Sequence, residues 1–121
     1  MGRTILVIDD EPNILGQIAD RLSANQYDVL EATDGQEAVA CAIEARPDLI
    51  LLDVEMPKHG GMDVLQQLKM HALTRRIPVI ALMVKVGADS VVTVHDRHAV
   101  AQLMKPVDPQ QLLDIVERHL P

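Results

Sequence analysis

Short apolar runs alternate along the chain with segments in which apolar residues recur every three or four positions. The runs predict strands at 4–8, 27–32, 48–53, 77–82 and 99–104. The recurring positions predict the buried faces of four helices: Ile14, Leu15, Ile18 and Leu22; Ala38, Val39, Ala42 and Ile43; Val64, Leu65 and Leu68; and Leu112, Leu113, Val116 and Leu120. Consecutive apolar residues at 49–52 indicate a strand buried on both faces, as in a parallel sheet covered by helices.

Start signals support two of these helices. Asp34 lies three residues before Glu37, which is the spacing of a capping box, and Asp108 precedes Pro109 as an N-cap precedes proline at the first helical position. The segment 84–98 is rich in valine, and β-branched residues are mediocre helix formers. We expect a crossover helix there that is short or irregular. The whole alternation predicts an α/β fold, a doubly wound parallel sheet of five strands with about five helices.

Length and composition narrow the possible functions. A chain of 121 residues predicts one domain, spanning 1–121. It has one Tyr and no Phe or Trp, so aliphatic residues and Met must form its core. The formal net charge of −7 argues against nucleic acid or an anionic membrane as the main partner. No targeting segment is visible, so we expect a cytoplasmic location. The single cysteine, Cys41, is interpreted as a small core residue.

Charged residues follow three of the predicted strands. Asp9 and Asp10 follow the first, Asp53 ends the third, and Lys105 follows the fifth. Because ligands of doubly wound sheets bind beyond the carboxyl ends of the strands, we expect these side chains to converge there. Three carboxylates that lie so close repel one another, and Mg²⁺ relieves such repulsion. A carboxylate held in this way can act as a nucleophile toward phosphorus, with a lysine and a metal offsetting the charge.

Three segments carry a resemblance to response-regulator receiver domains: VIDDEP at 7–12, LLDVEMP at 51–57 and KP at 105–106. The resemblance covers the whole chain. It implies a flavodoxin-like sheet with strand order 2-1-3-4-5. It also implies a phosphorelay, in which a histidine kinase or phosphotransfer protein docks near the first helix and donates a phosphoryl group. An effector protein or domain then receives the signal, and no activity is expected beyond the receiver's own phosphorylation and dephosphorylation.

The resemblance also implies a role for each residue of the site. Asp53 matches the phosphoacceptor of the family. Asp9 and Asp10 match the pair that binds Mg²⁺, with Asp10 as the more direct ligand, and Asp53 and the backbone carbonyl of Glu55 complete the protein ligands. Lys105 matches the lysine that contacts the phosphoryl group, and its bond to the following proline is often cis in the family.

Four positions depart from the family pattern. Met83 stands where Ser or Thr usually binds the phosphoryl group, and Gln102 stands where an aromatic residue usually turns inward. Because Met cannot donate a hydrogen bond, we hypothesise that the usual hydroxyl–aromatic switch does not operate. His98 in place of Gly and Val107 in place of Phe are interpreted as neutral drift. The backbone N–H of Val84 is still able to contact a phosphoryl group.

Two features near Asp53 have more than one interpretation. The carboxylate of Glu55 either tunes dephosphorylation or is simply a solvated loop acid, and the sequence favours neither. Gly60 and Gly61 are interpreted as a turn into the third helix and not as a phosphate-binding loop, because no Walker motif occurs in the chain.

Other functions compete with the phosphorelay receiver. A pseudo-receiver would dock partners through the 84–118 face independently of phosphorylation; Met83 and Gln102 favour it, and the intact acids and Lys105 oppose it. A small aspartyl-phosphate hydrolase is disfavoured because the chain lacks an Asp-x-Asp motif at the nucleophile and has no residues for a cap domain. A flavin-binding module is disfavoured by the single aromatic residue.

Overall fold

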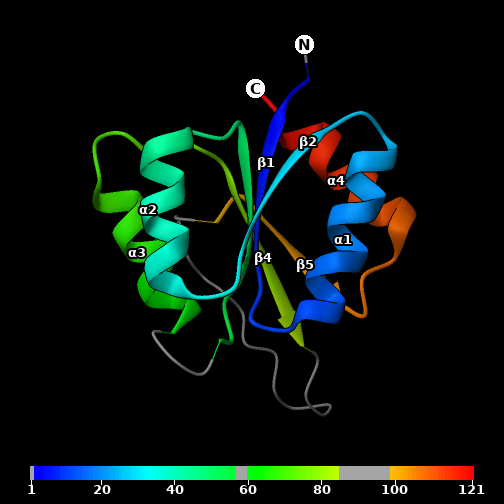
Figure 1. Ribbon diagram of the computed structural model, residues 1–121, viewed down its shortest axis with the longest axis horizontal. Coiled ribbons are helices and arrows are strands. Elements are labelled where there is room, and N and C mark those ends of the chain that lie inside the picture. Colours follow the sequence, from blue (N-terminus) through cyan, green and yellow to red (C-terminus); the bar gives the residue numbers. More distant parts are fainter. Residues whose placement is uncertain (1, 57–59, 85–98) are drawn as a thin grey trace.

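The computed structural model describes residues 2–56, 60–84 and 99–121, and these form a parallel sheet with helices on both faces (Figure 1). The five strands pair in the order β2-β1-β3-β4-β5, which is the expected order. The strands are β1 (Thr4–Ile8), β2 (Asp28–Ala32), β3 (Leu49–Asp53), β4 (Val79–Val84) and β5 (Ala101–Lys105). The helices in the described part of the chain are α1 (Pro12–Ala24), α2 (Gly35–Ala45), α3 (Gly61–Met70) and α4 (Pro109–His119).

Alternate residues of each strand enter two separate hydrophobic cores. On β1, Leu6 and Ile8 pack with α2 and α3, whereas Ile5 and Val7 pack with α1 and α4. This follows from the period of two along a strand, and it explains why β1 and β3 are apolar at consecutive positions. The two pairs of helices lie on opposite sides of the sheet, as Figure 1 shows. Both predicted properties, a buried parallel sheet and an aliphatic core, are confirmed.

The bounds of four strands differ from the sequence prediction: β2 and β3 each start one residue later, and β4 and β5 lie further toward the C-terminus. Strand β4 covers Val79–Val84 and not 77–82, because the N–H of Ile77 donates to Thr74 in a turn and pairing with β3 starts at the carbonyl of Pro78. Strand β5 starts at Ala101, two residues later than predicted. The crossover helix expected at 84–98 lies outside the described residues, apart from Val84, which belongs to β4.

The helix starts behave as predicted. The side chain of Asp34 accepts a hydrogen bond from the N–H of Glu37 at 2.7 Å, and that of Asp108 accepts one from Gln111 at 3.3 Å. Gly60 is the N-cap of α3, so the glycine pair does form the turn into that helix. Cys41 is half-buried against the core on the α2 and α3 side, and burial raises the pKa of its thiol.

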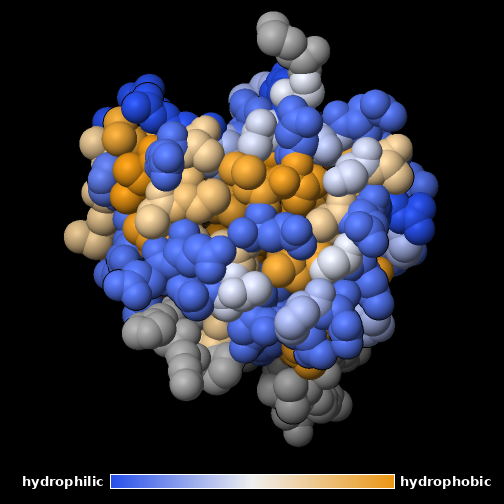
Figure 2. All heavy atoms as spheres, in the orientation of Figure 1, coloured by the Kyte–Doolittle hydropathy of each residue, from blue (hydrophilic) through white to orange (hydrophobic). Residues whose placement is uncertain are grey.

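On the face drawn in Figure 2, hydrophobic side chains gather between α1 and α2, where the edge strand β2 crosses, and hydrophilic residues surround them. Val29 and Leu30 of β2 are half-buried there. Among the described helices, none combines the length and the apolar character that crossing a bilayer requires. Both chain ends lie at the amino ends of the strands, opposite the strand ends that carry the acids (Figure 1).

Candidate functional site

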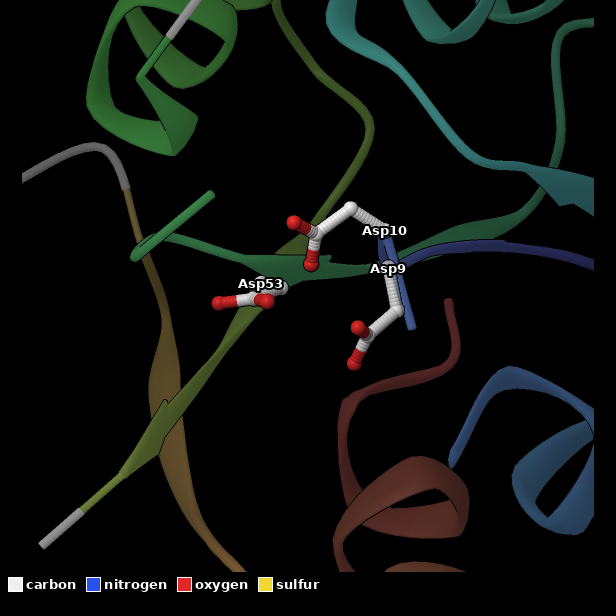
Figure 3. Close-up of side chains that lie close together, drawn as sticks. All are labelled: Asp9, Asp10 and Asp53. Carbon is white, nitrogen blue, oxygen red and sulfur yellow. The ribbon is translucent and has the colours of Figure 1, made fainter. Parts of the chain in front are cut away.

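Three carboxylates meet where β1 and β3 end. One oxygen from each of Asp9, Asp10 and Asp53 lies within 4.8 Å of the others. Asp9 and Asp53 are buried, and Asp10 is exposed. Figure 3 shows Asp9 and Asp10 leaving the end of β1 in different directions, with Asp53 beside them on β3. The structure therefore brings together the three acids that the sequence places at strand ends.

The strand register explains why these side chains share a face. Ile8 of β1 is paired with Leu52 of β3, so Asp9 lies level with Asp53. Each acid lies two residues after a position that faces α1 and α4, Val7 on β1 and Leu51 on β3, so by alternation both acids lie on that face. Lys105 ends β5 two residues after Leu103, whose side chain packs on that same face. The three residues converge because the same period of two applies on three strands.

The ammonium of Lys105 connects the two buried carboxylates. Its Nζ lies 2.6 Å from Asp9 Oδ2 and 3.1 Å from Asp53 Oδ2. Burial alone would lower the pKa of Lys105, but the hydrogen bonds and charges of Asp9 and Asp53 outweigh it, and the net pKa is raised. The lysine is therefore firmly cationic. The Lys105–Pro106 peptide bond is cis, as the resemblance implied.

Backbone amides hold the other oxygens of the same two carboxylates. The N–H of Glu11 donates to Asp9 Oδ1 at 3.0 Å, and the N–H of Glu55 donates to Asp53 Oδ1 at 2.8 Å. Each acid thus has one oxygen fixed by the residue two positions later and one oxygen facing Lys105. Burial raises the pKa of Asp9, although Lys105 and the Glu11 amide partly oppose that shift.

The donor set suits a hard divalent cation. Asp9 Oδ2 is fully buried, and within the described part of the chain the Lys105 ammonium is the one cationic group in contact with it. Among the described residues the cluster consists of carboxylates alone. Carboxylate oxygens suit Mg²⁺, which keeps several waters and needs few protein ligands. The exposed Asp10 opens the cluster to solvent. These residues therefore fit Mg²⁺ by their chemistry.

Of the positions that depart from the family pattern, Met83 lies on β4 and Gln102 on β5. Met83 is 3% exposed and packs in the core shared with α2 and α3, so its side chain is on the face opposite to Asp53. Gln102 on β5 is exposed and paired in register with Ala81. Val107 is half-buried against the other core, and His98 lies outside the described residues. Thr74 is buried, and its hydroxyl donates to the carbonyl of Leu68, so it does not take the place of the missing hydroxyl.

Two contacts near the site were not predicted from the sequence. The carboxylate of Glu55 accepts a hydrogen bond from the backbone N–H of Val84 at 2.7 Å. Gly61 lies so close to β3 that an added Cβ would stand 2.2 Å from the carbonyl oxygen of Asp53. The double glycine was the only sequence signal of that close approach. No sequence pattern indicated the Glu55 contact.

A groove of about 670 Å³ lies beside the site, between α1 and the loop that joins β5 to α4. Lys105 and Pro106 line it on one side, and the apolar residues Ile14, Ile18 and Leu112 line much of the rest. The resemblance implied that a donor docks near the first helix, but the groove itself was not predicted, because its lining comes from segments far apart in the sequence.

Comparison with known proteins shows the family to which the chain belongs. The family model of the response regulator receiver domain matches residues 5–117, so the chain belongs to that family. Receiver domains are the signalling domains of two-component response regulators. The identification made from the three sequence segments is therefore confirmed.

Individual relatives differ in how much of their length the chain covers. It is 37% identical over 113 residues to the phosphate regulon transcriptional regulatory protein PhoB of Pseudomonas aeruginosa, a match that covers 93% of this chain and 49% of PhoB. The chain thus spans about half the length of PhoB. It is 34% identical over 116 residues to protein PilH of the same organism, covering 96% of each. The structure of the chemotaxis protein CheY4 of Vibrio cholerae superposes with a TM-score of 0.89 at 29% identity, covering 99% of this chain and 100% of that one.

Proposed function

We propose that this receiver domain accepts a phosphoryl group on Asp53 in a two-component phosphorelay. The observation that carries the proposal is the ammonium of Lys105, which lies within 3.1 Å of Asp53 and 2.6 Å of Asp9 at the sheet edge where the acids meet. An oxygen of Asp53 forms a bond to phosphorus while the bond from phosphorus to the donor's leaving group breaks. The leaving group, an imidazole nitrogen or a carboxylate oxygen, departs with the electron pair.

The other residues act on charge and position. Lys105 offsets negative charge on the phosphoryl oxygens, and the Glu55 amide orients Asp53 through its Oδ1. Asp9, Asp10, Asp53 and the backbone carbonyl of Glu55 are the groups that would hold Mg²⁺, as in the family the chain belongs to. When bound, the metal supplies positive charge that offsets the charge developing on the transferring group.

The donor in this proposal is a phosphohistidine on a histidine kinase or phosphotransfer protein. The groove between α1 and the β5–α4 loop supports docking beside Asp53, because Lys105 lines it and most of its other walls are apolar. The signal then passes to an effector protein or domain. Met83 is buried on the opposite face and cannot donate, so the switch operates without the usual hydroxyl.

Intact mass after incubation with acetyl phosphate and Mg²⁺ tests the proposal. One added phosphoryl group is expected in the wild type, none in Asp53→Asn, and none in the wild type when a chelator removes the metal. Thr74→Val is a matched control, since Thr74 is buried away from the site and its loss should leave phosphorylation unchanged. A folded wild type that gains no mass under these conditions contradicts the proposal and favours the pseudo-receiver.

A further inference from the structure

The backbone N–H of Val84 is the donor of interest at the end of β4. Strand β3 ends at Asp53, which pairs with Leu82, and the Val54 N–H donates to the Leu82 carbonyl. Val84 therefore lies just beyond the last residue of β3, at the edge of the sheet that carries Asp53. Among the described residues its N–H has no strand partner on that side, because β3 has already ended.

The carboxylate of Glu55 accepts a hydrogen bond from that N–H. Glu55 Oε2 accepts from Val84 N at 2.7 Å, which is the short distance typical of a charge-assisted hydrogen bond. The same residue contacts Asp53 through its backbone, because its own N–H donates to Asp53 Oδ1 at 2.8 Å. Glu55 is exposed, so its side chain can leave this position for solvent without opening the core.

The contact between Glu55 and Val84 gains importance because Met83 supplies no hydrogen-bond donor beside Asp53. Its thioether cannot donate, and its side chain is 3% exposed in the core on the opposite face. Within the described part of β4, the Val84 N–H is therefore the donor that remains for a phosphoryl oxygen attached to Asp53. A carboxylate oxygen and a phosphoryl oxygen are both anionic acceptors, and a single N–H that points at one cannot serve the other equally well.

We propose that the Glu55 carboxylate is an internal competitor for the phosphoryl group. It occupies the phosphoryl-oxygen position on the Val84 N–H while Asp53 is unmodified. Phosphorylation displaces it, both by taking the donor and by repulsion between like charges. Displacement of Glu55 to solvent is then the structural change that replaces the missing hydroxyl switch. This inference rests on the proposed phosphoacceptor function of Asp53.

Fluoroberyllate with Mg²⁺, a mimic of the phosphoryl group on a carboxylate, tests the competition without turnover. Binding is measured by ¹⁹F NMR and calorimetry for the wild type, Glu55→Ala, Glu55→Asp and Glu31→Gln. Glu55→Ala removes the competing acceptor and leaves the backbone carbonyl in place. Glu55→Asp keeps the charge but is one methylene too short to reach Val84. Glu31→Gln removes an exposed charge from β2, which β1 separates from β3, and is the electrostatic control.

We expect Glu55→Ala and Glu55→Asp to bind fluoroberyllate about threefold to tenfold more tightly than the wild type, because a competitor that fills a site most of the time lowers apparent affinity by that factor. Glu31→Gln should bind like the wild type. The Val84 amide proton resonance provides a second measurement, since it should move upfield in the free Glu55→Ala variant. It should also move in the wild type on addition of fluoroberyllate.

The outcomes separate the inference from the function on which it rests. Equal affinity of the wild type and Glu55→Ala, with no binding to Asp53→Asn, overturns the inference and leaves the phosphoacceptor function standing. Tighter binding by Glu55→Ala and Glu31→Gln alike, with Glu55→Asp unchanged, shows a general effect of charge and also overturns it. Failure of every folded variant to bind fluoroberyllate overturns the proposed function and this inference together.

Discussion

At the scale of single residues, Lys105 determines the electrostatics of the acidic cluster. Its ammonium contacts two buried carboxylates, and Asp9 is fully buried. Another lysine, Lys69, is also half-buried, but it donates to the backbone carbonyls of Arg75 and Ile77. Burial lowers the pKa of Lys69, whereas the acids raise that of Lys105. Comparing variants of the two lysines therefore separates the effect of an ion pair from that of hydrogen bonds to the backbone.

Replacing Lys105 by Met should destabilise the metal-free protein by about 3 kcal/mol, because it leaves buried carboxylates without a counter-ion. Mg²⁺ should restore part of that loss, since a bound cation takes over the charge. Lys69→Met should cost about 1 kcal/mol through its lost hydrogen bonds, with no extra response to Mg²⁺. Urea unfolding with chelator and with Mg²⁺ measures both. Equal responses of the two variants to Mg²⁺ would contradict the assignment of Lys105 to the cluster.

The site residues differ in how far the sequence could predict them. Asp9, Asp53 and Lys105 were predictable because strand ends and the period of two determine where their side chains converge. The bond from Val84 to Glu55 was not, since it joins residues 29 positions apart and depends on one side-chain rotamer. The sequence therefore left the role of Glu55 open.

At the scale of elements, the start of α3 lies directly against the end of β3. An added Cβ on Gly61 would meet the Asp53 carbonyl oxygen and Val54 Cα, both at 2.2 Å. These are backbone atoms, which cannot rotate away as the end of a side chain can. By contrast, an added Cβ on Gly16 in α1 would meet nothing within 4 Å. The close approach of α3 fixes the backbone that carries Asp53.

Gly61→Ala should therefore destabilise the protein by about 3 kcal/mol, at the upper end of the usual cost of overpacking. It should also impair phosphorylation, because the clash displaces Asp53. Gly16→Ala should be neutral or stabilise by up to about 1 kcal/mol, since glycine in a helix interior is unfavourable relative to alanine. Chemical denaturation measures both changes. A Gly61→Ala variant as stable as the wild type would show that α3 can move away from β3 at little cost.

Element bounds were predictable where the sequence contains a boundary signal. Asp34 and Asp108 marked two helix starts, and the acids at 9 and 53 marked strand ends. The predicted start of β4 at Ile77 was too early, because Pro78 cannot donate to a sheet ladder and β4 starts directly after it. That start is also fixed by the turn at Thr74 and by the register with β3, which are tertiary features.

At the scale of the whole molecule, negative charge is concentrated as well as abundant. The formal net charge is −7, and three carboxylates share one edge of the sheet. The sequence predicted this edge, because all five strands are parallel and their carboxyl ends coincide. It could not predict the groove beside α1, whose lining depends on how α1 and α4 pack on the same face.

Mg²⁺ should stabilise the folded chain by binding at this edge. At about ten times the Kd the expected gain is about 1.4 kcal/mol, and the corresponding rise in Tm is roughly 5 °C. Sodium chloride at equal ionic strength should have a much smaller effect, because it screens the acids without bridging them. Asp10→Asn should lose most of the Mg²⁺ response. Thermal unfolding followed by circular dichroism measures the shifts, and an equal response to both salts would argue against a metal site.

Borohydride reduction of the phosphorylated chain tests most directly that Asp53 is the nucleophile. An acyl phosphate on an aspartate is reduced to homoserine, whereas an unmodified aspartate is not. Peptide mapping after treatment with acetyl phosphate, Mg²⁺ and borohydride should find homoserine at position 53 and aspartate at positions 9 and 10. Homoserine at position 9 or 10, or a phosphoryl group on another side chain with Asp53 intact, would contradict the account.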